Sequence, residues 1–244
     1  MKKHRWFAAL AVMVMALAVA GCSDGSSGGS GNSSGAGNSG VDYSKCAVGD
    51  FVLKDGTILS KDETPESGTV AAVIVRAAAD GKPALGVGIV RTKLAWCTES
   101  AIGYNTNITA LQGDEISGYM DGRDGWEKLK AACSDAEKNP GNYPAWNYSL
   151  TYAKNNGLTG DLAEGWYLPT GAELYTIYQN KDVVDASLSK ADGSQFSTGC
   201  YWSCCQYPSS NNFALDLSFF VGIMLRRYDK TNYDDDVCSV RAFN

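Results

Sequence analysis

Short apolar runs separated by turn residues open the folded part of the chain. Asp50–Leu53 and Ile58–Leu59 flank Asp55-Gly56, a dipeptide typical of the turn in a two-stranded hairpin. Two longer runs rich in β-branched residues follow at Val70–Val75 and Leu85–Val90, with a turn that contains Gly and Pro between them. The pattern therefore predicts that strands begin the domain and that the second pair is buried.

Apolar residues at helical spacing occupy the middle of the chain. They occur in two segments, one with Trp126, Leu129 and Cys133 and the next with Trp146, Leu150 and Ala153. A third helix is predicted after Pro169, where Thr170 and Glu173 have the spacing of a capping box. We expect three helices in this region.

The pattern returns to strands after Gly199. They are predicted at Cys200–Cys204, Phe213–Phe219, Ile223–Tyr228 and Val237–Phe243. Strands, then helices, then strands, without a βαβ alternation, indicate an α+β domain. The chain also lacks a glycine-rich phosphate loop, which argues against a nucleotide-binding fold.

The N-terminal segment has the pattern of a bacterial lipoprotein signal peptide, predicted at residues 1–21. Basic residues in Met1–Arg5 precede the apolar run Trp6–Ala20, which is shorter than the roughly 20 residues of a membrane-spanning helix. The resemblance to such signals implies cleavage before Cys22, a diacylglyceryl thioether on its sulfur and an acylated amino terminus. We therefore expect a membrane anchor that is lipid and not a transmembrane helix.

A tether is predicted between the anchor and the domain, at residues 22–42. Ser23–Gly40 is composed almost entirely of Gly, Ser and Asn, a composition that gives a flexible coil spanning about 25 Å root-mean-square. Ser23, directly after the lipidated cysteine, carries no charge that favours retention in the inner membrane. We expect an outer-membrane or cell-surface location, with one folded domain at residues 43–244.

Charge and histidine content narrow the function classes. The formal net charge is −6, and without Lys2, Lys3 and Arg5 the balance becomes 18 basic against 27 acidic side chains, or −9. Electrostatic binding of nucleic acid is therefore not expected. The only histidine is His4, so Ser-His-Asp and Cys-His catalysis and His-ligated metals are excluded from the mature chain. We expect a non-enzymatic protein without a cofactor.

An ordered set of segments gives the chain a resemblance to a known family. They are Gly165–Thr170, Glu173-Leu174, Tyr201–Ser203 and Val237–Phe243. With these segments the chain, from about Val48 to its C-terminus, resembles the treponemal variable lipoproteins of diversity-generating retroelements. The resemblance implies a C-type-lectin-like fold of the formylglycine-generating-enzyme branch. It also implies that residues of about 199–244 display a variable surface that binds a protein or glycan ligand.

The composition of this region fits the resemblance. Such retroelements mutate adenines, largely in AAY codons, whose products cannot include Lys, Glu, Gln, Met or Trp. Between Ser203 and Val237 these five types occur only as Gln206, Met224 and Lys230, where about seven are expected from average composition. Similar proteins carry fixed residues at those three places.

Position by position, the resemblance assigns the ligand-binding surface to a mixture of aromatic, polar and charged residues. The candidates are Cys204, Cys205, Tyr207, Ser209, Ser210, Asn211, Asn212, Phe213, Phe220, Arg226, Arg227, Tyr228, Asp229, Thr231, Tyr233, Asp234, Asp235 and Asp236. Pro208, Leu215, Phe219, Val221, Ile223, Leu225 and Asn232 lie among them at variable positions. Rigid aromatic contacts and adaptable polar groups suit recognition. For Phe213, Leu215 and Phe219 the alternative stays open that their side chains alternate along a strand and point into the core. Trp166, Leu168, Trp202 and Arg241 are interpreted as scaffold.

Three other functions, a thiolate metal site, a copper oxidase and calcium-dependent carbohydrate binding, are each compatible with one feature of the sequence. Cys200, Cys204, Cys205 and Cys238 can form a thiolate metal site, although their spacing is not that of a zinc ribbon. Cys200 and Cys238 are also the candidates for a copper oxidase of the related enzymes. The run Asp234–Asp236 is the candidate for calcium-dependent carbohydrate binding, although the paired lectin motifs are absent. With Cys22 lipidated, seven cysteines remain, and the sequence does not determine their pairing.

Overall fold

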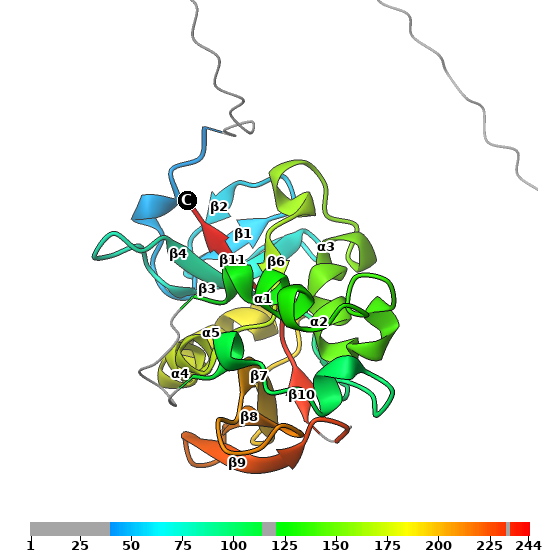
Figure 1. The fold of residues 1–244 in the computed structure, drawn as a ribbon. Coiled ribbons are helices and arrows are strands. Elements are labelled where there is room, and N and C mark those ends of the chain that lie inside the picture. The colour runs from blue at the N-terminus through cyan, green and yellow to red at the C-terminus, as the bar shows by residue number, and fades with distance from the viewer. Residues whose placement is uncertain (1–39, 114–120, 233–234) are drawn as a thin grey trace, which may run out of the picture. The chain divides into compact units, whose positions relative to one another are not determined.

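The computed structural model describes residues 40–113, 121–232 and 235–244, and within these ranges the side chains of residues 225–227 are not described. The described residues form two sheets and five α-helices, which confirms the predicted α+β class (Figure 1). The predicted signal peptide, Cys22 and nearly all of the tether lie outside the described residues. None of the described helices is long and apolar enough to cross a membrane.

The first sheet has six strands in the order β2-β1-β3-β4-β11-β6. Their bounds are Phe51–Leu53 (β1), Ile58–Leu59 (β2), Val70–Arg76 (β3), Ala84–Gly88 (β4), Trp166–Tyr167 (β6) and Val240–Phe243 (β11). The predicted hairpin is confirmed, since Phe51 pairs with Leu59. The C-terminal strand returns to this sheet, where Val240 pairs with Val87 on β4 and Tyr167 on β6.

Both faces of β3 are buried, which explains why its sequence is a continuous apolar run and not an alternation. Val73 and Val75 belong to one hydrophobic cluster, and Ala72 and Ile74 belong to another on the opposite face. β4 is also buried throughout, so the predicted burial is confirmed for Val70–Val75 and as far as Gly88 in the second run, whereas Val90 is exposed.

The second sheet has five strands in the order β5-β10-β7-β8-β9. Their bounds are Thr92–Lys93 (β5), Cys200–Gln206 (β7), Phe213–Ser218 (β8), Ile223–Asp229 (β9) and Asp236–Val237 (β10). β7, β8 and β9 form an antiparallel meander, while β10 runs parallel to β7. β9 is an edge strand of this sheet.

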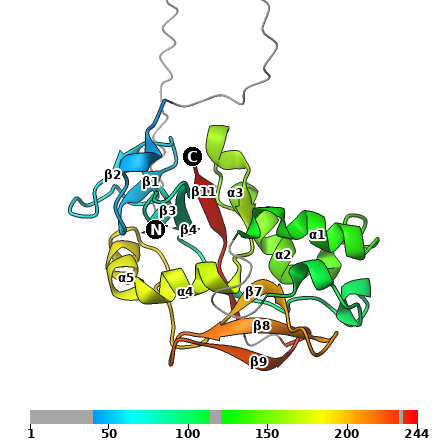
Figure 2. The same ribbon diagram turned by 60° about the vertical axis from the view of Figure 1, so that its left-hand side comes forward.

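Helix α4 lies between the two sheets, contacting β3 on one side and β7 and β8 on the other (Figure 2). The helices are Gly125–Ala132 (α1), Pro144–Leu150 (α2), Tyr152–Asn155 (α3), Gly171–Gln179 (α4) and Lys181–Lys190 (α5). The predicted capping box is present at the start of α4. The Thr170 hydroxyl accepts a hydrogen bond from the Glu173 amide, and the Glu173 carboxylate accepts one from the Thr170 amide.

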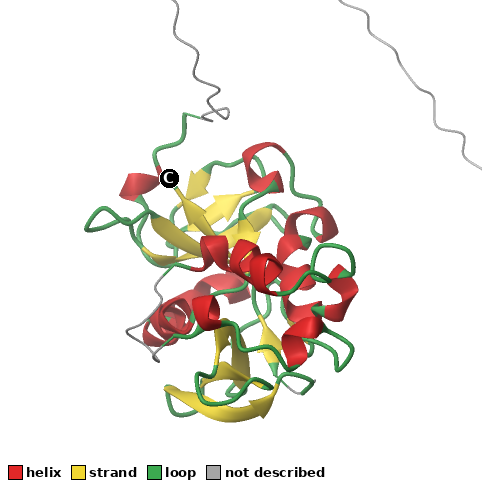
Figure 3. Cartoon of the chain, viewed as in Figure 1, coloured by secondary structure: helices red, strands yellow, loops and turns green. Residues whose placement is uncertain are grey.

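The structure differs from the predicted helices and strands in three places (Figure 3). The second predicted helix is broken at Thr151 into α2 and α3, and α5 was not predicted. The predicted strand Val237–Phe243 is two strands, because Cys238 and Ser239 carry the chain from the second sheet to the first. The sequence shows one apolar run there because both strands are buried.

Candidate ligand-binding surface

Three exposed apolar side chains lie at the turn that joins β8 to β9. Phe220, Val221 and Ile223 are 75%, 50% and 52% exposed, and we call these three residues the apolar tip. Single exposed apolar side chains are common on proteins, whereas several at one place are typical of a contact surface. The apolar tip is therefore the strongest candidate for a recognition element in the described part of the chain.

The residues beside the apolar tip fix its backbone. Phe219 is buried, with its ring stacked on Phe196 at 4.9 Å and edge-on to Tyr178 at 5.7 Å between ring centroids. Gly222 has a φ of +68°, and its amide donates to the carbonyl of Ser218 at 2.8 Å. A Cβ at Gly222 would lie 2.2 Å from the Tyr178 ring, so only glycine fits this turn.

Hydrogen bonds to one carboxylate organise the polar end of the same sheet. Tyr104 and Asn212 donate to one oxygen of Asp229 at 3.0 and 3.2 Å, while the amide and hydroxyl of Thr231 donate to the other at 2.9 and 2.7 Å. Burial acts to raise the pKa of Asp229, but the hydrogen bonds outweigh it and lower the pKa. Asp229 thus holds the loops together as an ionised acceptor.

Between Ser203 and Val237, the three residues whose types mutated AAY codons cannot encode are all buried. Gln206, Met224 and Lys230 lie in the interior of the C-terminal region. The Gln206 side-chain oxygen accepts a hydrogen bond from the amide of Ile108 at 3.0 Å. These three side chains therefore belong to the interior of the domain.

Lys230 joins three segments beneath the surface. Its ammonium donates to the carbonyls of Gly103 and Asn211, each at 2.6 Å, and lies 4.8 Å from the centroid of the Trp96 ring. Burial lowers the pKa of Lys230 to about 8. The loop at 207–212 is consequently tied to the loop that contains Gly103.

The structure places the predicted ligand-binding residues in different environments. Those exposed are Ser209, Asn211, Phe220 and Tyr228, and those half-buried are Tyr207, Ser210, Asn212, Phe213, Asp229, Thr231 and Asp236. Tyr233 and Asp234 lie outside the described residues, and the side chains of Arg226 and Arg227 are not described. Of the predicted set, eleven residues can thus be placed at or near the surface.

Three of the predicted surface residues are corrected by the structure. Cys204, Cys205 and Asp235 are buried, so their expected place on an exposed surface is wrong. Cys204 and Cys205 lie on β7, an inner strand of the sheet against which α4 packs, so their side chains have no access to solvent. Asp235 precedes β10 and is 3% exposed. Burial also raises the pKa of the Cys204 thiol well above its usual value. Strand alternation alone could not reveal this, because both faces of β7 are covered.

The structure shows which of Phe213, Leu215 and Phe219 point into the core. Leu215 and Phe219 are buried, whereas Phe213 is half-buried. Trp166, Leu168 and Trp202 are also buried, as expected for scaffold. Arg241, the fourth residue interpreted as scaffold, donates to the carbonyls of Asp161 and Glu164 at 2.6 and 2.9 Å.

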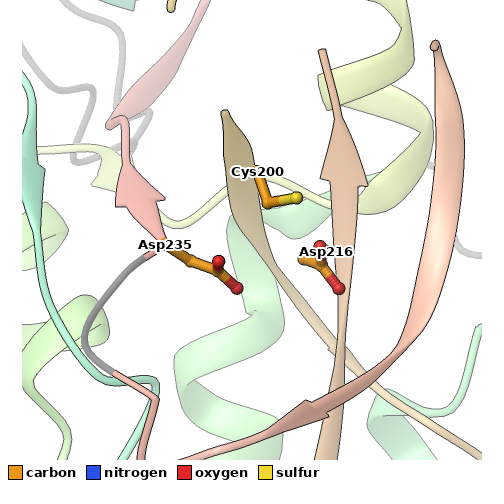
Figure 4. Close-up of side chains that lie close together, drawn as sticks. All are labelled: Cys200, Asp216 and Asp235. Atoms are coloured by element: carbon orange, nitrogen blue, oxygen red, sulfur yellow. The ribbon is translucent and has the colours of Figure 1, made fainter. Parts of the chain in front are cut away.

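A second cluster of polar side chains lies inside the same sheet (Figure 4). Cys200, Asp216 and Asp235 place one potential ligand atom each within 4.8 Å of the others. Burial, together with the charge of Asp235, raises the pKa of Asp216 to about 8, and burial raises that of the Cys200 thiol to about 12. Sequence reasoning missed Asp216, although an aspartate in an otherwise apolar strand was a visible signal.

The cysteines do not gather into one site. In the described ranges, the cluster of Cys200 with two aspartates is the one group of three or more potential metal ligands, so the thiolate set of Cys200, Cys204, Cys205 and Cys238 is not formed. The seven cysteines from Cys46 to Cys238 are all unpaired.

Comparison with known proteins finds a similar solved structure but no matching family. No protein-family model matches the chain, and no curated protein matches it. A fimbrial protein from Bacteroides ovatus ATCC 8483 has a similar structure, with a TM-score of 0.60 and 14% sequence identity over 81% of this chain. The match covers 49% of the fimbrial protein, so this chain spans about half of that protein's length. At this identity the likeness shows a shared fold.

Proposed function

We propose that the protein is a lipid-anchored ligand-binding protein of the cell envelope that acts in surface adhesion or recognition. The observation that carries the proposal is the apolar tip, which is exposed on a turn whose backbone is fixed by Phe219 and Gly222. A rigid turn presents its side chains to a partner with little loss of conformational entropy on binding. Phe220 is the expected central contact, since aromatic residues dominate binding energies.

The finer fold in this proposal is a C-type-lectin-like domain of the formylglycine-generating-enzyme branch. The order of the matching segments from Val48 to the C-terminus supports it, and the return of β11 to the N-terminal sheet agrees with it. The burial of Gln206, Met224 and Lys230 supports a surface that varies around fixed structural positions. An adenine-rich template repeat beside a reverse-transcriptase gene is the genomic feature that this part of the proposal requires.

The proposed location is the outer membrane or the cell surface, with the lipid on Cys22 as anchor. The signal-peptide pattern and the Gly/Ser/Asn tether support this location. The structural likeness to a fimbrial protein supports an adhesive role at the surface. The proposed partner is a protein or glycan on another cell or molecule, bound without catalysis.

The test is binding of the purified full chain to an array of glycans and to immobilised fibronectin, laminin and collagen. The tip variant carries Phe220→Ser, Val221→Ser and Ile223→Thr, and the control carries Ile102→Ser and Val183→Ser, which replace exposed apolar residues elsewhere. We expect wild type and control to bind the same array members with equal Kd values. Loss of interface anchors should weaken the tip variant about 30-fold or more. An unchanged Kd for the tip variant contradicts the proposal.

A further inference from the structure

Cys200, Asp216 and Asp235 come from three separate segments and converge on one point (Figure 4). Cys200 begins β7, Asp216 lies in the middle of β8, and Asp235 directly precedes β10. Their sulfur and carboxylate oxygen atoms lie within 4.8 Å of one another, a separation that allows all three to contact one ion. Asp216 and Asp235 are buried, while Cys200 is partly accessible.

Asp216 is a buried carboxylate without a counter-charge among the described residues, the environment expected of a metal ligand. Its side chain is fully buried, and neither carboxylate oxygen accepts a hydrogen bond of normal geometry. The Cys200 thiol and the Asp235 carboxylate are the polar groups beside it. No described lysine or arginine forms an ion pair with it. A buried carboxylate normally has a hydrogen-bond or charge partner, so this one requires an explanation.

We propose that Cys200, Asp216 and Asp235 form a binding site for a divalent transition-metal ion, with zinc as the expected ion. The thiolate of Cys200 disfavours calcium and magnesium, which prefer oxygen ligands alone, whereas zinc accepts both sulfur and carboxylate oxygen. Three protein ligands leave the fourth tetrahedral position to water. On coordination the Cys200 thiol and the protonated Asp216 carboxyl each release a proton to solvent, and no electron is transferred.

The site has a structural consequence for the neighbouring surface. A bound ion joins β7 and β8 to Asp235, the residue that precedes β10. Zinc therefore stabilises the fold around the candidate ligand-binding surface without being part of it. The metal site is independent of the ligand binding proposed above.

The test uses the full chain with Cys22→Ser in every sample, so that no thiol outside the described residues contributes. Zinc affinity and stoichiometry are measured by competition with a chromophoric chelator. Cobalt is then added to report sulfur coordination through its near-ultraviolet thiolate charge-transfer band. We expect one equivalent of zinc and a charge-transfer band in the parent protein.

Matched variants locate the ion. Cys200→Ser should abolish the charge-transfer band, and Asp216→Asn, which keeps the size of the side chain, should weaken zinc binding at least about 100-fold, since loss of an outer-shell partner alone costs roughly 10- to 100-fold. Cys46→Ser removes a buried thiol in the other hydrophobic cluster and should change neither. Zinc should raise the melting temperature of the parent and of Cys46→Ser but not of Asp216→Asn.

Three results overturn the proposal: no zinc bound by the parent, a charge-transfer band retained in Cys200→Ser, or zinc affinity retained in Asp216→Asn. The first, with a higher melting temperature for Asp216→Asn, would show a protonated acid pair instead of a metal site. If Cys200→Ser does not fold, stoichiometry and the cobalt spectrum of the parent, together with Asp216→Asn, still decide the question.

Discussion

The two sheets of this domain are built from different kinds of residue. The six-stranded sheet is apolar almost throughout, and its strands contribute none of the large apolar side chains that are exposed in the described residues. The strands of the five-stranded sheet bury polar side chains, including Ser203, Gln206 and Asp216, and with the β8–β9 turn they expose Phe220, Val221, Ile223 and Tyr228. The six-stranded sheet follows the usual rule that apolar side chains are buried. The five-stranded sheet departs from it, because it buries polar side chains and exposes apolar ones.

Under the proposed function, the difference separates the residues that fold the domain from those that contact a ligand. Hydrophobic burial stabilises the first sheet, whereas specific hydrogen bonds from groups such as Lys230 and Asp229 hold the loops of the second. Side chains that are neither buried nor hydrogen-bonded are then free to change. The following variants break or sharpen this comparison.

The largest expected effect is that of Trp202→Ala in the second sheet. Trp202 is fully buried, and its indole donates to the carbonyl of Leu94 at 3.0 Å. Truncating a buried tryptophan lowers the free energy of unfolding by about 3–5 kcal/mol. Urea unfolding followed by fluorescence measures it, with Phe220→Ala as the exposed control. A loss below about 1 kcal/mol would show that the second sheet does not depend on its core.

A pH-dependent effect is expected from Glu173 on α4, between the sheets. Its oxygens accept hydrogen bonds from the Thr170 amide and the Tyr167 hydroxyl, and burial raises its pKa to about 7. The folded state therefore holds this proton more tightly than the unfolded chain. The resulting stability is complete below the unfolded pKa near 4.5 and is lost as pH rises through 7.

Denaturant unfolding at several pH values checks the Glu173 effect. Between pH 4.5 and 7 we expect the free energy of unfolding to fall by about 3 kcal/mol more in wild type than in Glu173→Gln, since the raised pKa of Asp216 acts equally in both proteins. Parallel pH profiles for the two proteins would contradict the raised pKa.

Lys230→Met tests the polar ties of the second sheet. The substitution keeps an unbranched side chain but leaves the Gly103 carbonyl without the Lys230 donor, and leaves the Asn211 carbonyl with the Gln206 side-chain amide at 3.5 Å. An unsatisfied buried acceptor costs about 1–3 kcal/mol, whereas Lys138→Met at an exposed position should change stability by less than about 0.5 kcal/mol. Equal unfolding midpoints for Lys230→Met and wild type would show that these hydrogen bonds do not hold the loop.

Much of the fold could be predicted from the sequence because local signals and tertiary packing agree. The Asp55-Gly56 hairpin, the capping box of α4 and the strands β7, β8 and β9 each have a strong pattern. Helix α5 escaped prediction because Val184 and Leu188 are nearly its only buried apolar residues. Its other buried positions are polar, so no apolar stripe marks the helix.

The candidate site was predicted less completely, for a different physical reason. Exposure depends on which loops and helices cover a strand, and the sequence of β7 does not show that both faces are covered. Cys204 and Cys205 were therefore placed on the surface although they are buried. The meeting of Cys200 with Asp216 and Asp235 depends on strand register and on the path of the chain before β10, which no local pattern encodes.

The smallest expected effect tests the central claim most directly, because the account requires the apolar tip to be dispensable for folding. The measurement is the free energy of unfolding of the variant Phe220→Ser, Val221→Ser and Ile223→Thr, compared with wild type. Exposed substitutions usually change stability by less than about 0.5 kcal/mol each, so the total should stay below about 1.5 kcal/mol with one cooperative transition. A loss of about 3 kcal/mol or more, in the range expected for Trp202→Ala, would show that the apolar tip belongs to the core and would contradict the account.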